Sequence, residues 1–277
     1  MEIRQIITEK QNLKFLRWSK LKNSSGTAGS FLKAYSIISG KKQYYKLSNY
    51  DSIKGVIGIE SVNEIIVDRL LSLLGIEHVN YKLINADIIV DEKVLNTYLC
   101  VSEDFKDQNE DKIALDCYYD IEHKKGEDVL TFCIRNGWES YIYEMLVVDF
   151  IILNRDRHGA NIEVLRNKKK KTIRLAPLFD HGLSLLFNCY SNDDIKNFDI
   201  MEDKRVNSYI GGRSTKDNLN LIPVEKLPKL NNLTKEDKNI IFKDLDGILS
   251  KELIDKTWEM IINRWSYYEN FCNTRQM

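Results

Sequence analysis

N-R-D-R-H-G-A-N at residues 154–161 and P-L-F-D-H-G at residues 177–182 are the two stretches that decide the fold of this chain. Between them I-E-V-L-R predicts a strand, N-K-K-K-K a polar turn and T-I-R-L-A the returning strand. Asp156 and Asn161 precede this hairpin and Asp180 follows its second strand, so we expect the three side chains to lie together at the open end of the hairpin. Magnesium prefers oxygen ligands of this kind, together with phosphates and water.

The same three residues suit phosphoryl transfer. That reaction needs a metal ion to neutralise phosphate charge and a carboxylate to orient the attacking hydroxyl group, and it needs little covalent chemistry from the protein. A polar turn capped by its own Asx side chains would explain any one of these residues alone. The order of all three, after a nearly all-apolar helix predicted over residues 139–154, favours the catalytic interpretation.

The first third of the chain predicts strands around one helix. Four strands are expected, within residues 21–38, 42–48, 81–90 and 94–102. A turn at residues 39–41 joins the first two. Residues 62–76 have apolar side chains at helical spacing, and Gly75 lies where this helix should end. Ser61 and Glu64 are spaced as a capping box at its start.

The character of the chain changes near residue 102. S-E-D-F-K-D-Q-N-E-D-K is dense in charge and suits a hinge, and the chain beyond it is mostly helical, with an amphipathic helix over 253–271. Residues 188–232 are expected to be largely irregular, and R-V-N-S-Y-I-G-G-R-S at 205–214 could close a cleft or receive a substrate. The prediction is an α+β fold. A small antiparallel β lobe with one helix spans residues 1–102, and a larger, mainly helical lobe spans 103–277.

The D-x-x-x-x-N loop followed by a strand and an aspartate resembles the protein-kinase-like superfamily. R-D-R-H-G-A-N with L-A-P-L-F-D-H-G-L-S-L is most similar to the bacterial HipA-like and CtkA-like serine/threonine kinases, a resemblance that extends over roughly residues 20–270. D-R-H-x-x-N is also the loop of the phosphatidylinositol 3/4-kinases in the same superfamily. The resemblance implies a bilobal kinase fold that uses ATP and Mg²⁺.

The resemblance also assigns roles to the residues of the two stretches. Asp156 would be the catalytic base or the residue that orients the hydroxyl group, while Asn161 and Asp180 would hold magnesium. His158 would either assist proton transfer or hydrogen-bond the loop backbone. Two departures bear on regulation: the DFG motif is here Asp180-His181-Gly182, and no A-P-E segment follows it.

A Gly-rich loop and a lysine would hold the nucleotide phosphates in such a fold. The loop is G-T-A-G-S, which comprises Gly26, Thr27, Ala28, Gly29 and Ser30. Its backbone N–H groups could approach ATP, although a plain flexible turn has the same composition. Lys46 lies in the next strand, where the phosphate-binding lysine belongs, and Lys33, Lys41 and Lys42 are its competitors.

Two further nucleotide contacts follow from the resemblance. Glu64 in the predicted helix would pair with Lys46, and Glu60 is the alternative partner. Backbone groups near Val101 and Glu103, at the hinge, would meet the adenine edge.

The resemblance implies transfer of the γ-phosphate of ATP to serine or threonine of a protein. HipA-like kinases autophosphorylate in the Gly-rich loop, where this chain has Ser24, Ser25, Thr27 and Ser30. Some are the toxins of toxin–antitoxin pairs, so a small antitoxin or a separate N-terminal subdomain is an expected partner, unless the chain acts alone like CtkA. A lipid or small-molecule kinase is the first alternative, and a non-catalytic pseudokinase is the second.

Composition excludes other classes. The 277 residues include 41 basic and 41 acidic side chains, so the net charge of zero gives no field for a nucleic-acid backbone. Five cysteines and four histidines form no zinc or disulfide pattern. The charged N-terminus is no secretory signal, and the apolar run at 145–153 is too short for a membrane span. We therefore expect a cytoplasmic protein, or an effector secreted without a signal peptide.

Overall fold

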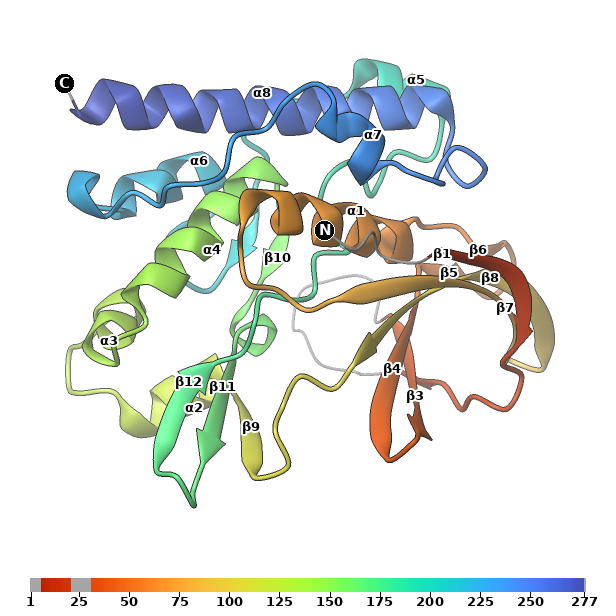
Figure 1. The fold of residues 1–277 in the computed structure, drawn as a ribbon, viewed down its shortest axis with the longest axis horizontal. Helices are drawn as coiled ribbons and strands as arrows, with labels where there is room; N and C mark the ends of the chain where they lie inside the picture. Colours follow the sequence, from red (N-terminus) through yellow and green to blue (C-terminus); the bar gives the residue numbers. More distant parts are fainter. Residues whose placement is uncertain (1–5, 21–30, 277) are drawn as a thin grey trace.

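A six-stranded sheet is the largest element of the computed structural model, which describes residues 6–20 and 31–276 (Figure 1). In spatial order its strands are β1 (Ile6–Asn12), β7 (Tyr81–Val90), β8 (Lys93–Glu103), β4 (Lys41–Leu47), β3 (Leu32–Ile38) and β2 (Ser19–Lys20). Strands β7, β8, β4, β3 and β2 pair antiparallel, and the strands predicted at 42–48, 81–90 and 94–102 are β4, β7 and β8. A short β-ladder of β5 (Tyr50–Asp51) and β6 (Gly55–Val56) follows β4.

Strand β1 is an addition to the predicted sheet, and it runs parallel to β7. Ile6 lies opposite Leu83 and Asn12 opposite Asp87. Parallel neighbours need a long connection rather than a tight turn, and β2 to β6 and the first helix lie between β1 and β7 along the chain. The otherwise antiparallel sheet therefore gains one parallel pair at its edge.

Helix α1 (Glu60–Leu74) covers one face of this sheet and ends, as predicted, at Gly75, whose φ of 79° is left-handed. Its start differs from the prediction. The N-cap residue is Ile59, and no side chain caps the helix, so the capping box of Ser61 and Glu64 does not form. The N–H of Ser61 donates instead to Ser48 Oγ. The Glu64 carboxylate pairs with Lys46 of β4.

The two faces of the sheet belong to different cores. Lys33, Lys46, Cys100 and Leu83 are successive cross-strand partners on β3, β4, β8 and β7. Residues directly opposite each other share a face, and Cys100 and Leu83 pack in the main core with α1. Both lysines therefore lie on the α1 side. Val101, the next residue of β8, packs in a smaller core on the other face.

The rest of the chain is mostly helical, as predicted. Its elements up to the second quoted stretch are β9 (Glu110–Ala114), α2 (Leu115–Glu122), α3 (Val129–Arg135), α4 (Glu139–Ile151), β10 (Asp156–Arg157), the 3₁₀ helix η1 (Gly159–Asn161), β11 (Glu163–Asn167) and β12 (Thr172–Leu175). Helix α4 is buried over most of its length, and the β11–β12 hairpin is the predicted one, joined on its other edge by β9.

Residues 188–232 contain more structure than the weak periodicity predicts. They hold α5 (Asn192–Asn197), β13 (Asn207–Ser208), α6 (Thr215–Asn218), η2 (Leu219–Leu221) and η3 (Val224–Lys226), and α7 (Asp237–Ile241) follows. The terminal helix α8 (Lys251–Gln276) runs along one side of the molecule (Figure 1). Its buried Arg264 donates to the carbonyl groups of Phe150, Ile200 and Glu202, which ties this region to α4. None of the described helices is long and apolar enough to cross a membrane.

Replacing Gly75 by alanine tests the left-handed end of α1. A Cβ atom at Gly75 would lie 3.0 Å from Asn231 Nδ2, and an alanine with left-handed φ is strained. We expect Gly75→Ala to lower the free energy of unfolding by about 1–2 kcal/mol in chemical denaturation. Gly247→Ala is the matched control, because a Cβ there meets nothing within 4 Å. Equal stability of the two variants would contradict the role given to Gly75.

Candidate active site

A partly buried lysine links strand β4 to helix α1 and to the second quoted stretch. Lys46 Nζ lies 2.9 Å from Glu64 Oε1 and 2.8 Å from Asp180 Oδ1. Lys33 Nζ, from the neighbouring strand, lies 3.5 Å from Asp180 Oδ2. Three residues singled out in the sequence thus meet, and Lys33, a competitor of Lys46 there, joins the same cluster.

The charges of this cluster stabilise one another. Burial alone would lower the pKa of Lys46, but Asp180 and Glu64 outweigh it and raise this pKa well above its usual value. Burial would raise the pKa of Asp180, and here Lys46 and Lys33 outweigh it and hold this pKa well below its usual value. The lysine and the aspartate are therefore both charged at neutral pH.

Helix α1 fixes the backbone that follows Asp180. The N–H of His181 donates to Glu64 Oε2 over 3.0 Å, so one carboxylate contacts both Lys46 and this loop. Asn63 Nδ2 donates to the carbonyl groups of Gly182 and Ser184. Glu60, the alternative partner of Lys46, instead accepts from the N–H of Asn49 over 2.9 Å. The choice left open between Glu60 and Glu64 is thereby settled in favour of Glu64.

Asp180 has a strained backbone, and an uncharged histidine follows it. The φ of Asp180 is 59°, and its N–H donates to the hydroxyl group of Tyr81 over 3.3 Å. Burial and then the charge of Arg157 lower the pKa of His181 well below its usual value, so this imidazole is neutral. Its side chain is fully buried, at the position that the predicted DFG-type motif would give to phenylalanine.

Asp156 lies in β10 and is 7% exposed. Its N–H donates to Asn154 Oδ1, its carbonyl oxygen accepts from Asn161 Nδ2 over 2.8 Å, and its Oδ1 accepts from Asn207 Nδ2 over 2.8 Å. His158 Nδ1 accepts from the N–H of Ala160, while His158 Nε2 lies 3.7 Å from Asp156 Oδ2. Of the two roles weighed for His158, the backbone hydrogen bond is the one made in this structure.

A fully buried arginine holds the two loops together. Arg157 contacts Asp149 through three N–H···O hydrogen bonds of 2.9–3.2 Å. Its Nη1 donates to the carbonyl oxygens of Asn161 over 3.2 Å and Phe179 over 2.8 Å. Burial would lower the pKa of Arg157, but Asp149 more than offsets it and raises this pKa. Asp156 directly precedes Arg157, Asn161 supplies one of the bound carbonyl groups, and Asp180 directly follows Phe179, which supplies the other.

Solved structures share this arrangement of elements, although no protein-family model and no curated protein sequence matches the chain. CtkA, a proinflammatory kinase of Helicobacter pylori, aligns over 95% of this chain and 96% of its own, with a TM-score of 0.57 and 16% identity. This chain has a CtkA-like kinase fold. HipA of Shewanella oneidensis MR-1, from a toxin–antitoxin complex with HipB and operator DNA, aligns over 91% of this chain and 67% of its own, with a TM-score of 0.52 and 13% identity. The predicted fold class and the HipA/CtkA resemblance are thereby confirmed.

The side-chain oxygen atoms of Asn161 and Asp180 are of the kind that a magnesium ion prefers. Asn161 uses its amide nitrogen on Asp156, which leaves its oxygen for a ligand, and Asp180 supplies a carboxylate. Proteins bind Mg²⁺ with one or two carboxylates plus substrate phosphates and water. In the described residues no group of three or more His, Cys, Asp and Glu side chains could hold a metal ion.

The charge-dense stretch predicted as the hinge makes contacts that its composition alone did not predict. Lys112 Nζ lies 2.8 Å from Asp104 Oδ1 and 3.8 Å from the centroid of the Phe105 ring. The rings of Phe105 and Phe179 are 5.5 Å apart. Of the predicted hinge residues, Val101 is flanked by β7 and β4, whereas Glu103 pairs with β4 alone. The predicted Gly-rich loop, Gly26 to Ser30, lies outside the described residues.

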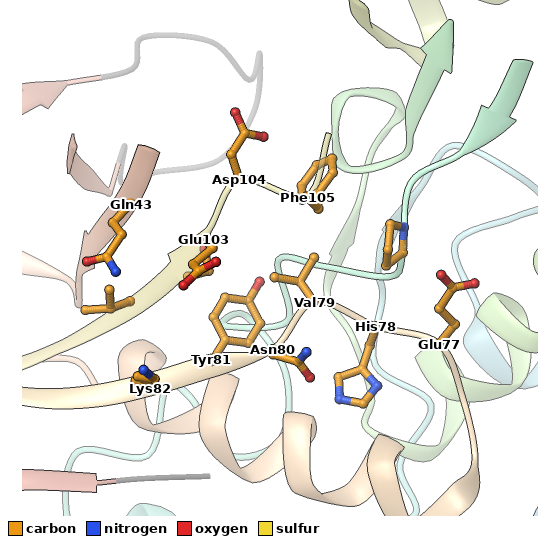
Figure 2. A pocket seen from close by; sticks show the side chains of 13 residues that line it. Gln43, Glu77, His78, Val79, Asn80, Tyr81, Lys82, Glu103, Asp104 and Phe105 are labelled. Atoms are coloured by element: carbon orange, nitrogen blue, oxygen red, sulfur yellow. The ribbon is translucent and has the colours of Figure 1, made fainter. Parts of the chain in front are cut away.

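A cavity of about 590 Å³ lies beside the hinge (Figure 2). Figure 2 shows its lining side chains, which come from β4, the loop before β7, β7 itself, the hinge and Pro177. Of the predicted site residues that the structure describes, Val101 and Glu103 line it. Tyr81 lines the cavity and also accepts from the N–H of Asp180, so the cavity adjoins the lysine–aspartate cluster.

Removing the buried cation tests the junction of the loops. Arg157→Met would leave Asp149 buried without its partner, so we expect the free energy of unfolding to fall by about 3–5 kcal/mol. Asp149→Leu in the Arg157→Met background should restore part of this loss, because both buried charges are then absent. Chemical denaturation measures the free energy of unfolding of the wild type, of Arg157→Met and of the double variant.

Lys168→Met is the control, since Lys168 pairs with Asp111 and both side chains are more than half exposed. Exposed ion pairs contribute little. An Arg157→Met protein as stable as Lys168→Met would show that the guanidinium does not hold the loops.

Proposed function

We propose that this chain is an ATP- and Mg²⁺-dependent kinase that phosphorylates serine or threonine of a protein. The observation that carries the proposal is the meeting of Lys46, Glu64 and Asp180 above a loop that holds Asp156 and Asn161. The CtkA-like and HipA-like folds support it. The hinge after residue 102 would divide a nucleotide-binding lobe, 1–102, from a catalytic lobe, 103–277.

In the proposed reaction the acceptor hydroxyl oxygen bonds to the γ-phosphorus, and the bond from that phosphorus to the bridging oxygen breaks. Asp156 orients the hydroxyl group and takes its proton. Lys46 contacts the phosphates, and Glu64 keeps its ammonium group in place. Asn161 and Asp180 would hold Mg²⁺, which neutralises phosphate charge when bound. Gly26–Ser30 and backbone groups near Val101 and Glu103 would contact ATP. His158 is proposed as an aid to proton transfer.

Labelled ATP with Mg²⁺ and a protein acceptor tests this function. We expect Asp156→Ala and Asp180→Ala to lower transfer by on the order of 10²–10⁴-fold, because they remove the base and a metal ligand. Asp193→Ala, at an exposed aspartate of α5, is the control and should transfer like wild type. Chelation of Mg²⁺ should stop transfer.

Other outcomes separate the alternatives. Label that enters phosphoinositide vesicles but never protein would make the chain a lipid kinase. Binding of ATP without transfer to any acceptor would make it a pseudokinase.

We also propose autophosphorylation in the Gly-rich loop, as in HipA-like kinases. A phosphate there would repel the ATP phosphates and switch the kinase off. After incubation with ATP and Mg²⁺, mass spectrometry should find a phosphate on Ser24, Ser25, Thr27 or Ser30 of the wild type and none on Asp156→Ala. Prior phosphorylation should slow transfer to other proteins. A phosphate only outside this loop would refute the switch.

A partner protein is the last element of the proposal. The HipA structure contains HipB, and by analogy this chain would bind a small antitoxin or a separate N-terminal subdomain. The alternative is a kinase that acts alone, and the alignment with 96% of the CtkA chain supports it.

A further inference from the structure

The segment R-V-N-S-Y-I-G-G-R-S, residues 205–214, lies directly against the loop that holds Asp156. Asn207 and Ser208 form β13, which pairs in parallel with Asp156 and Arg157 of β10. The N–H of Asn207 donates to Arg155 O over 2.9 Å. The N–H of Tyr209 donates to Arg157 O over 2.8 Å. The two backbones are therefore hydrogen-bonded on both sides of Asp156.

This pairing brings an amide onto the proposed catalytic carboxylate. Asn207 Nδ2 donates to Asp156 Oδ1 over 2.8 Å. The carboxyl torsion of an aspartate is broad, so its two oxygens are not distinguished by rotamer preference alone. The hydrogen bond from Asn207 distinguishes them, because it uses Oδ1 and leaves Oδ2 for the acceptor hydroxyl group. His158 Nε2 lies 3.7 Å from Oδ2.

We propose that Asn207 is a positioning residue that fixes which oxygen of Asp156 receives the acceptor proton. The inference rests on the proposed kinase function and adds a residue to its acceptor side. If binding of the acceptor protein moved residues 205–214, the hydrogen bond from Asn207 would move the Asp156 carboxylate with them.

The segment that delivers Asn207 is braced from its other side. The N–H of Val206 donates to Arg213 O over 2.9 Å, which closes the turn. Asn218 accepts from the N–H of Gly212 over 2.7 Å and donates to its carbonyl group. Gly211 has a φ of 88°, and a Cβ atom there would lie 2.4 Å from Asn218 Oδ1. The side chains of Val206 and Ile210 are buried. Asn207 therefore projects from a fixed turn, as a positioning group must.

Three substitutions at one position test the role of the amide. Asn207→Ala removes it, and we expect kcat for phosphotransfer to fall roughly tenfold to a hundredfold, because the base loses its orientation. The KM for ATP should not change, since the side-chain hydrogen bond of Asn207 goes to Asp156, which is proposed to act on the acceptor and not to bind the nucleotide. Asn207→Gln, which keeps an amide donor, should recover part of kcat. Asn207→Asp, which places a like charge beside Asp156, should be slower than Asn207→Ala.

Asn220→Ala is the matched control, because Asn220 is an exposed asparagine of η2, away from β10. It should keep the kcat of wild type. The inference is wrong if Asn207→Ala behaves like Asn220→Ala. It is also wrong if Asn207→Ala raises the KM for ATP as much as it lowers kcat, since Asn207 would then only support the fold.

A double-mutant cycle with Asp156→Ala separates this inference from the proposed function. If Asn207 acts through Asp156, then Asn207→Ala causes no further loss of transfer or of melting temperature in the Asp156→Ala background. Equal shifts in both backgrounds would overturn the inference. A wild type that transfers no phosphate refutes the proposed function, and the melting temperatures of the same four proteins then still decide whether Asn207 holds Asp156.

Discussion

The guanidinium of Arg157 is the interaction on which the site depends. A buried cation is stable only when its charge is paired and its donors are used, and this one uses a carboxylate of α4 and the carbonyl groups of both loops. These hydrogen bonds fix the position of β10 relative to α4, and they also fix the position of Phe179, the residue before Asp180. The separation of the two proposed metal ligands is thereby set by an arginine that touches neither side chain.

Helix α1 has a similar part on the opposite side of the site. It is buried nearly all round, yet Glu60, Asn63 and Glu64, within little more than one turn, each contact a different segment. Each satisfies a group that has no strand or helix partner of its own: an N–H before the helix, two loop carbonyl groups and a lysine of β4. Polar groups in so apolar a helix are stable because each is paired. They also make the position of the sheet and of the Asp180 loop depend on one rigid element.

The sequence predicted the parts of the site that follow local rules. Asp156, Asn161 and Asp180 flank the predicted hairpin, Lys46 lies in the predicted strand and Gly75 ends the predicted helix, and these placements are seen, whereas the roles of the site residues stay predictions. The capping box does not form, because the Glu64 carboxylate contacts Lys46 and the N–H of His181 instead. Asn207 was not predicted because a parallel pairing across fifty residues leaves no periodic signal. Arg157 could have been suspected, because Asp149 in an apolar helix needs a buried partner.

The bonds that Asp180 makes to Lys46 and Lys33 have a consequence for how the site fills. Both ammonium groups and the carboxylate already serve as counter-ions for one another. In the proposed kinase, a bare phosphate that drew Lys46 away would leave Asp180, which is only partly exposed, with Lys33 as its remaining ion-pair partner. A nucleotide that carried its metal ion would compensate for this loss, because the phosphate would pair with the lysine and the cation with the aspartate. The metal complex, rather than the bare nucleotide, would then be the species that enters the proposed site without leaving a charge unpaired.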